Sequence, residues 1–160
     1  MESITMETLS LSTFDKDNKI YLDFLKKLLC DKTIKQRFQG FLPNLLRENT
    51  NSIIGRGFFV SCDNELIGYI DIGNYNINEK SVYLRCAIEK SKRKKAYGRR
   101  ILSEISDYIF NMHPEVETIK LKIDKDNVPS LKVADACGYK WINDDYYGLS
   151  NPYTKSHTHK

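Results

Sequence analysis

The sequence predicts one domain of the mixed α/β class (α+β mixed), with a mostly antiparallel, twisted sheet of about six or seven strands and helices on both faces. Three observations lead to this prediction. Strand-like alternation of apolar and polar residues is interspersed with helical periodicity. Short turns join the middle strands and favour antiparallel hairpins. The 160 residues, 41% apolar and 29% charged, suit a single globular domain.

The first third of the chain predicts a strand followed by two helices. Residues 3–12 alternate imperfectly between apolar and polar side chains, which indicates a strand. Asp15 or Asp17 is expected to cap a helix whose apolar residues recur at helical spacing. These residues are Ile20, Tyr21, Phe24, Leu25, Leu28 and Leu29. A shorter helix is predicted around residues 33–47, interrupted by a glycine and a proline.

The middle third predicts three strands in succession. Residues 57–62 and 66–72 flank the turn 63–65, which reads Asp-Asn-Glu and indicates a hairpin. A second turn, 73–80, leads to a strand over 82–88. Alternation places four of its apolar residues on one face. They are Val82, Leu84, Cys86 and Ile88.

The last third predicts a helix, a strand, a second helix and two short strands. The helix covers about 98–111, and residues 118–124 alternate strictly as a strand does. Asp126 or Asn127 is expected to cap the next helix, which ends before Gly138.

The remaining residues complete a domain that spans 1–153. Residues 139–142 and 146–149 predict the two final strands, and the polar residues 154–160 predict a disordered tail. The predicted order is therefore β-α-α-β-β-β-α-β-α-β-β.

Composition excludes several classes of protein. No apolar stretch approaches the ~20 residues that a membrane span needs, and the first residues lack the basic and apolar regions of a signal peptide. We therefore expect a cytoplasmic protein without a membrane partner. The cysteines form no CxxC pair, so we expect buried free thiols and no metal site. They are Cys30, Cys62, Cys86 and Cys137.

The positive charge is concentrated in one segment. Residues 90–100 contain seven Lys or Arg and no acidic residue, whereas the rest of the chain has 18 basic and 21 acidic residues. A loop that runs onto a helix N-terminus offers unpaired N–H groups to an anion, most often a phosphate. Arg99 adds a charge there, and Gly98 allows close approach of the backbone to the ligand. A solvated basic face is the alternative explanation.

Two motifs resemble those of the GNAT superfamily of N-acetyltransferases. The acyl-CoA loop of this family is written (Q/R)-x-x-G-x-(G/A), and six consecutive residues align with it: Arg93, Lys94, Lys95, Ala96, Tyr97 and Gly98. A later block of the family has Asn, Ser, Gly and an aromatic residue at fixed spacing. Its counterparts here are Asn127, Ser130, Gly138 and Tyr139.

The resemblance implies a binding mode for acetyl-CoA as cosubstrate. Strand 82–88 would be the central strand and would splay from 118–124, and the acyl-pantetheine arm would lie in the gap between them. The arm would hydrogen-bond the backbone of Cys86, Ala87 and Ile88 as an added strand does. The diphosphate would lie on the N–H groups of residues 93–98, and Asn127 would contact the pantetheine arm.

The sequence departs from the family pattern at two positions. Ala96 replaces a glycine, so we expect the loop to bend differently. Ala134 stands where many members have a tyrosine that protonates the leaving thiolate. A later block without this tyrosine is similar to that of the branch that acetylates the N-termini of ribosomal proteins. In that branch a serine hydroxyl can face the thiolate, and Ser130 is the matching residue here. The alternative is a first-turn hydroxyl bonded to the backbone.

Candidates for a general base and for the acceptor cleft come from the strands. Asp71, at the end of a predicted strand, is the preferred carboxylate over Glu79 and Glu89. Tyr83 and Arg85 point away from the Leu84 face, so they line the acceptor cleft or pack under a helix.

The leading hypothesis is an acyl-CoA-dependent N-acetyltransferase that transfers acetyl directly to a primary amine, on a protein N-terminus or a small molecule. The first alternative is a nucleic-acid-binding module that uses the basic segment 90–100. The second is an acyl-CoA-binding sensor without turnover, suggested by the missing tyrosine. The resemblance also implies a homodimer through the C-terminal strands.

Overall fold

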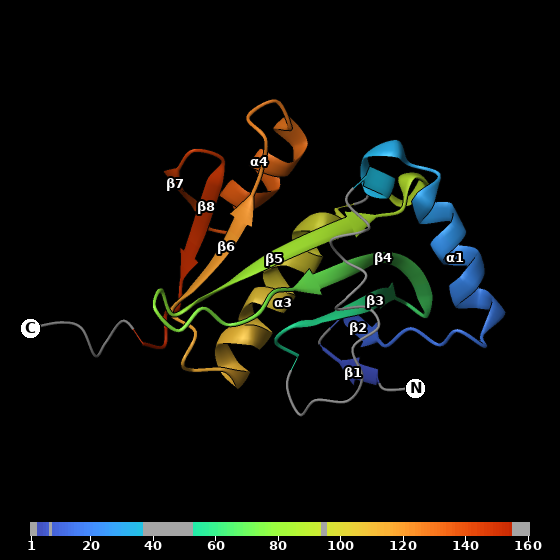
Figure 1. Cartoon of the computed structure of the whole chain (residues 1–160), viewed down its shortest axis with the longest axis horizontal. Helices are drawn as coiled ribbons and strands as arrows, with labels where there is room; N and C mark the ends of the chain where they lie inside the picture. Colours follow the sequence, from blue (N-terminus) through green and yellow to red (C-terminus); the bar gives the residue numbers. More distant parts are fainter. Residues whose placement is uncertain (1–2, 7, 37–52, 94–95, 155–160) are drawn as a thin grey trace, which may run out of the picture.

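The structure is a computed structural model that describes residues 3–6, 8–36, 53–93 and 96–154. Its strands are β1 (Ser3–Thr5), β2 (Leu9–Ser12), β3 (Arg56–Cys62), β4 (Glu65–Ile72), β5 (Ser81–Ile88), β6 (Thr118–Lys122), β7 (Lys140–Asn143) and β8 (Tyr146–Ser150). They form one sheet in the order β1-β2-β3-β4-β5-β6-β8-β7 (Figure 1). All neighbours are antiparallel except β5 and β6, which are parallel.

The helical elements lie between these strands. They are α1 (Lys19–Leu29), the short 3-10 helix η1 (Lys90–Lys92), α3 (Tyr97–Met112) and α4 (Val128–Ala136). Residues 32–36 are also helical, which agrees with the start of the second predicted helix; the rest of that prediction lies outside the described residues. The disorder predicted for the tail falls almost wholly on residues 155–160, also outside them. Within the described ranges, no helix is long and apolar enough to cross a membrane.

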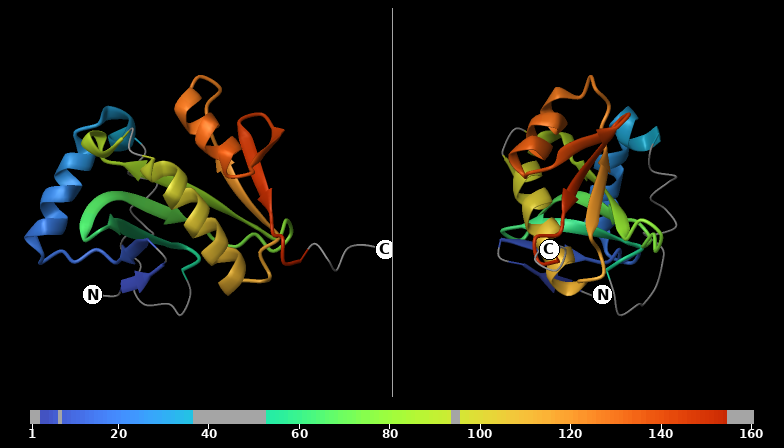
Figure 2. Two further views of the ribbon diagram at one scale, coloured as in Figure 1. Left: turned by 180° about the vertical axis from the view of Figure 1, so that it is seen from behind. Right: turned by 90° about the vertical axis from the view of Figure 1, so that its left-hand side faces the viewer.

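Helices cover both faces of the sheet, as the sequence predicts. Phe58 and Phe59 are neighbours on β3 and therefore point to opposite faces. The ring of Phe59 lies 5.3 Å from that of Tyr21 and 5.9 Å from that of Phe24, both on α1. Phe58 belongs to the larger buried cluster on the other face, which α3 and α4 cover (Figure 2). The helical members of that cluster are Ile101, Ile105, Ile109, Phe110 and Ala134.

The two central strands separate along their length. Their pairing comprises Ser81 with Thr118, Val82 with Ile119 and Tyr83 with Lys120, and it ends there. The remainder of β5, from Leu84 to Ile88, is paired only with β4. Figure 1 shows β5 and β6 side by side at their starts and apart at their ends. The splay implied by the family resemblance is therefore confirmed.

The single strand predicted over residues 3–12 is wrong, because this segment folds back as the hairpin β1–β2. The apolar residues change phase within it, from even positions at Ile4 and Met6 to odd positions at Leu9 and Leu11. A turn absorbs the change, and the N–H of Met6 donates to the carbonyl of Leu9 at 2.8 Å. The sheet consequently has eight strands where about six or seven were predicted.

The cysteines are free thiols, but they are not uniformly buried. Cys62 is buried and Cys137 is half-buried, whereas Cys30 and Cys86 are exposed. Cys86 shares a face with the buried Val82 and Leu84, and its exposure follows from the loss of β6 as a neighbour beyond Tyr83. The splay therefore overrides the burial that alternation predicts for this position.

The start of α1 also differs from its prediction. Asn18, and neither Asp15 nor Asp17, is the N-cap residue, and its side-chain oxygen accepts a hydrogen bond from the N–H of Ile20 at 2.9 Å. Asp15 instead accepts a hydrogen bond from the N–H of Asp17 in the preceding turn. Both aspartates thus belong to the turn that precedes the helix and not to its cap.

We expect the substitution Asn18→Ala to lower the free energy of unfolding by about 1 kcal/mol, because it removes this cap. Asp17→Ala, one residue away, is the control and should change it by less than about 0.5 kcal/mol. Urea unfolding of both variants measures the difference. Equal losses would contradict the assignment of the cap.

Candidate active site

The N-terminus of α3 has backbone N–H groups that its N-cap side chain does not satisfy. Its N-cap residue is Ala96, which makes no side-chain hydrogen bond to the helix. The first backbone N–H groups of a helix have no partner within the helix. Here they belong to Tyr97, Gly98 and Arg99, and the helix dipole adds a partial positive charge. Lys94 and Lys95, also predicted to bind the cosubstrate, lie outside the described residues.

Ala96 adopts the backbone conformation that a glycine would. Its φ is +62° and its ψ is 12°, in the left-handed region. This conformation is strained by about 1–2 kcal/mol for a residue with a Cβ. Ala96 therefore occupies a conformation that favours glycine. Whether the loop as a whole bends differently stays a prediction, because residues 94 and 95 lie outside the described residues.

Gly98 lies where α3, β5 and α4 meet. A Cβ built on Gly98 would lie 3.4 Å from Cδ1 of Ile88 and 3.8 Å from a methyl group of Val133. These are ordinary contact distances, so a single methyl group fits. A larger side chain would extend into the space between β5 and α4. The glycine therefore keeps this end of the gap open.

The splayed half of β5 offers backbone groups to the gap at every second residue. The N–H of Glu89 donates to Ile67 of the β4 side, and the carbonyl of Tyr83 accepts from Gly73 on the same side. Because backbone groups alternate in direction along a strand, those of Cys86 and Ile88 face the gap. Those of Ala87, which is paired with Tyr69, face β4. Ala87 therefore does not offer its backbone to a ligand in the gap, contrary to its prediction.

The side chain of Arg93 forms hydrogen bonds with two other parts of the protein. Its Nε donates to the carbonyl of Ile88 at 3.1 Å, and its Nη2 donates to Oδ2 of Asp31 at 2.8 Å. Its own N–H makes a long hydrogen bond, 3.4 Å, to the carbonyl of Lys90. The groups that could receive an anion are consequently the N–H groups at the start of α3, four to six residues after Arg93.

The second motif forms the start of α4. Asn127, one of the two predicted candidates, is the N-cap residue, and its side-chain oxygen accepts a hydrogen bond from the N–H of Ser130 at 3.4 Å. Ser130 is half-buried and stands one helical turn before Val133, so both lie on the helix face near Gly98. No described residue forms a hydrogen bond with the Ser130 hydroxyl. Ala134, in place of a tyrosine, is fully buried.

Asp71 and Arg85 form an ion pair between β4 and β5. Oδ2 of Asp71 lies 2.6 Å from Nη2 and 3.1 Å from Nε of Arg85. The Asp71 side chain is only 1% exposed, whereas that of Arg85 is 46% exposed. The arrangement lets Asp71 hold the guanidinium in place. The sequence did not predict this pairing, which depends on the register of β4 and β5.

Two tyrosines lie together on the open face of the sheet. The ring of Tyr83 on β5 lies 5.7 Å from that of Tyr146 on β8. The ammonium of Lys120 lies 5.8 Å from the Tyr83 ring and is also paired with Glu79 at 2.7 Å. Tyr139, in contrast, is buried and bonded to Ser106, and burial raises its pKa. Tyr83 and Tyr146 are therefore the accessible phenols beside the point where β5 and β6 part.

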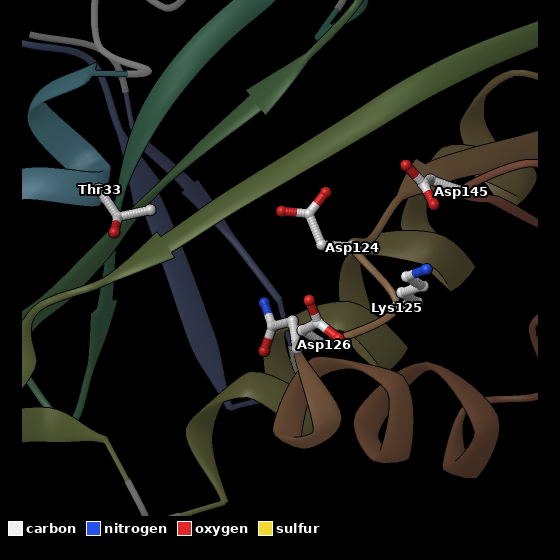
Figure 3. A pocket seen from close by; sticks show the side chains of 6 residues that line it. Thr33, Asp124, Lys125, Asp126 and Asp145 are labelled. Atoms are coloured by element: carbon white, nitrogen blue, oxygen red, sulfur yellow. The ribbon is translucent and has the colours of Figure 1, made fainter.

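A cavity of about 570 Å³ lies at the wide end of the gap. Thr33 lines it from one side, and residues that follow β6 or precede β8 line it from the other, as Figure 3 shows. These residues are Asp124, Lys125, Asp126, Asn127 and Asp145. In the part of the chain that is described, no three His, Cys, Asp or Glu side chains are placed to bind a metal ion.

Comparisons with known proteins identify relatives of this architecture. The model of the acetyltransferase (GNAT) domain family matches residues 31–146. No curated protein matches the chain. Several solved structures share the fold at 22% sequence identity or less.

The first of these structures is an acetyltransferase from Salmonella typhimurium that modifies the N-terminal serine of ribosomal protein L7/L12. It has a TM-score of 0.66 and 17% identity, with 93% of this chain and 99% of that chain covered. RimL in complex with coenzyme A has a TM-score of 0.66 and 16% identity, with 93% and 98% covered. The Campylobacter jejuni N-acetyltransferase PseH has a TM-score of 0.64 and 22% identity, with 90% and 99% covered.

We expect Ala96→Gly to raise the free energy of unfolding by up to about 1 kcal/mol. Glycine relieves the left-handed strain, and the gain is partly offset by its larger entropy in the unfolded state. Thermal unfolding measures the change. Ala136→Gly, at an ordinary helical position, is the control and should lower stability. A loss of stability in both variants would contradict the left-handed conformation.

Proposed function

The chain belongs to the GNAT acetyltransferase family, and on that premise we propose that it transfers acetyl from acetyl-CoA, bound between β5 and β6, to the α-amine of a protein N-terminus. One observation carries the proposal: the gap between the splayed strands ends at a helix N-terminus that no side chain caps. A ligand with an extended polar arm and a diphosphate matches both features at once.

The geometry supports a specific placement of acetyl-CoA. The diphosphate would accept hydrogen bonds from the N–H groups at the start of α3. The pantetheine arm would pair with the gap-facing backbone of Cys86 and Ile88, as an added strand does. Asn127 lines the cavity at the other side of the gap, where its amide can contact the arm. RimL, which has the same fold, was solved with coenzyme A.

The transfer requires a neutral amine and a polarised thioester. The amine nitrogen attacks the carbonyl carbon, the C–N bond forms, and the C–S bond breaks to release the thiolate of CoA. One proton leaves the nitrogen and one is delivered to the sulfur. Backbone N–H groups of β5 that face the gap would stabilise the oxyanion. The free hydroxyl of Ser130 would donate a hydrogen bond to the leaving sulfur.

An α-amine suits a site without a dedicated base. At pH 7 roughly one in six α-amines is neutral, against about one in 2,500 lysine side chains. Asp71, the preferred carboxylate, is buried and engaged by Arg85, so its contribution would be to position that guanidinium. Tyr83 would line the acceptor side. The Salmonella relative modifies an N-terminal serine, which supports the same acceptor class.

We expect acetyl-CoA to bind the protein and Gly98→Val to weaken binding at least tenfold, because the larger side chain fills the gap beside α3. Lys90→Ala is the control. It removes one charge of the same basic segment and should change the dissociation constant by less than about fivefold. Isothermal titration measures both variants. Binding of short DNA or RNA in place of acetyl-CoA would overturn the proposal.

We expect Ser130→Ala to lower kcat about 10- to 100-fold on a peptide with a free N-terminal serine, with acetyl-CoA affinity nearly unchanged. Thiol release measures turnover. Tyr83→Phe and Tyr146→Phe remove the accessible phenols and should retain most activity. Loss of turnover in either, with Ser130→Ala unaffected, would assign the proton donor to a tyrosine. Binding without thiol release in the wild type would identify a sensor.

A further inference from the structure

Arg93 connects three parts of the molecule that are distant in sequence. Its side chain bonds the carbonyl of Ile88 at the end of β5 and the carboxylate of Asp31, 62 residues earlier in the chain. The backbone of Arg93 belongs to the loop that leads to α3. The guanidinium thus joins the end of the central strand and the acyl-CoA loop to the segment that follows α1.

Asp31 uses its two carboxylate oxygens for different purposes. Oδ1 accepts hydrogen bonds from the N–H groups of Thr33 at 2.9 Å and Ile34 at 3.2 Å, so it caps the helical residues 32–36. Oδ2 accepts the hydrogen bond from Arg93. That hydrogen bond is the main reason that the pKa of Asp31 lies below its ordinary value.

The residues that Asp31 caps reach both the core and the cavity. Ile34 is buried in the cluster beneath α1, together with Tyr69 and Ala87 of the sheet. Thr33 lines the cavity opposite Asp124 and Asp126 (Figure 3). The position of Thr33 therefore depends on the Asp31 cap, and the hydrogen bond from Arg93 fixes the Asp31 carboxylate.

We propose that Arg93 is a positioning residue: through Asp31 it fixes the Thr33 wall of the cavity relative to the acyl-CoA loop. The pantetheine arm would lie along the opposite wall, at Asn127, so the Thr33 wall would set the position of the acceptor amine beside the arm. The inference rests on the proposed function for the identity of the two ligands. It assigns Arg93 a role other than binding the diphosphate through its side chain, because Nε and Nη2 are already used within the protein.

This contact lies at the surface, but its two side chains are less exposed than those of an ion pair within α1. The Asp31 side chain is 16% exposed and that of Arg93 is 42% exposed. Lys19 and Asp23 on α1 are equally close, at 2.8 Å, but their side chains are 87% and 50% exposed. That pair lies within one helix and connects no other element, so it provides a matched control.

Two substitutions break the link in different ways. Asp31→Asn keeps an oxygen for the cap, since asparagine caps helices as well as aspartate does, but it leaves no second oxygen for Arg93. Arg93→Gln introduces the residue that the family motif accepts at this position, and it removes the Nη2 donor. Asp23→Asn removes the control pair.

Hydrogen exchange of the ligand-free proteins tests the link itself. We expect the amides of Thr33 and Ile34 to exchange at least threefold faster in Asp31→Asn and Arg93→Gln than in the wild type, and at the wild-type rate in Asp23→Asn. The double variant should exchange no faster than the faster single variant, because both changes remove one interaction. Unchanged exchange in both single variants would overturn the proposal.

Kinetics test the consequence for the amine. With the serine-initiated peptide as acceptor, we expect KM for the peptide to rise about three- to tenfold in both variants, while the dissociation constant of acetyl-CoA changes less than twofold. A tenfold loss of acetyl-CoA affinity in Arg93→Gln with the peptide KM unchanged would make Arg93 a diphosphate ligand and overturn the proposal. If the wild type binds acetyl-CoA but acetylates no peptide, the proposed acceptor fails, and the exchange result alone decides on the link.

Discussion

The separation of β5 from β6 is the constraint on which the candidate site depends. After three paired residues the strands diverge, and β4 is the only strand with which the far half of β5 is paired among the described residues. Unpaired backbone groups inside a protein are costly. A sheet that leaves them at its centre presents a template for an added strand, and the proposed binding of the pantetheine arm in the gap rests on this.

The elements around the gap follow the ends of the two separated strands, β5 and β6. At the end of β5 the chain passes through η1 and the strained Ala96 into α3, so a helix N-terminus is directed at the opening. At the end of β6 it turns at Asn127 into α4, whose Ser130 and Val133 face the same space. Gly98 and Val133 come close there, and a larger residue at either position would narrow the gap.

The opposite faces of the sheet serve different purposes. On one face α3 and α4 complete a large apolar cluster that fixes the separated strands at their common start. On the other face α1 packs on β3, β4 and the end of β5, through Phe59, Tyr69 and Ala87. Its Tyr21 hydroxyl also donates a hydrogen bond to Ser12 of β2. Tyr83, Arg85 and Tyr146 remain accessible on that face. The first helix therefore leaves this part of the sheet uncovered.

The sequence by itself determined the order of most elements, the mixed sheet and the position of the basic segment directly before a helix N-terminus, because periodicity, capping residues and the two motifs are local signals. Only the tertiary structure decided the features that depend on residues far apart in the chain, namely side-chain exposure, the direction of backbone groups and the ion pairs. Alternation predicts burial for Cys86, but β6 is absent beside it. The family resemblance implies that Ala87 binds the cosubstrate through its backbone, together with Cys86 and Ile88. The pairing of Ala87 with Tyr69 instead directs its backbone groups toward β4 and away from the gap. Neither the pairing of Asp71 with Arg85 nor that of Asp31 with Arg93 has a local signal, because each depends on the register of strands or the packing of a helix against a distant loop.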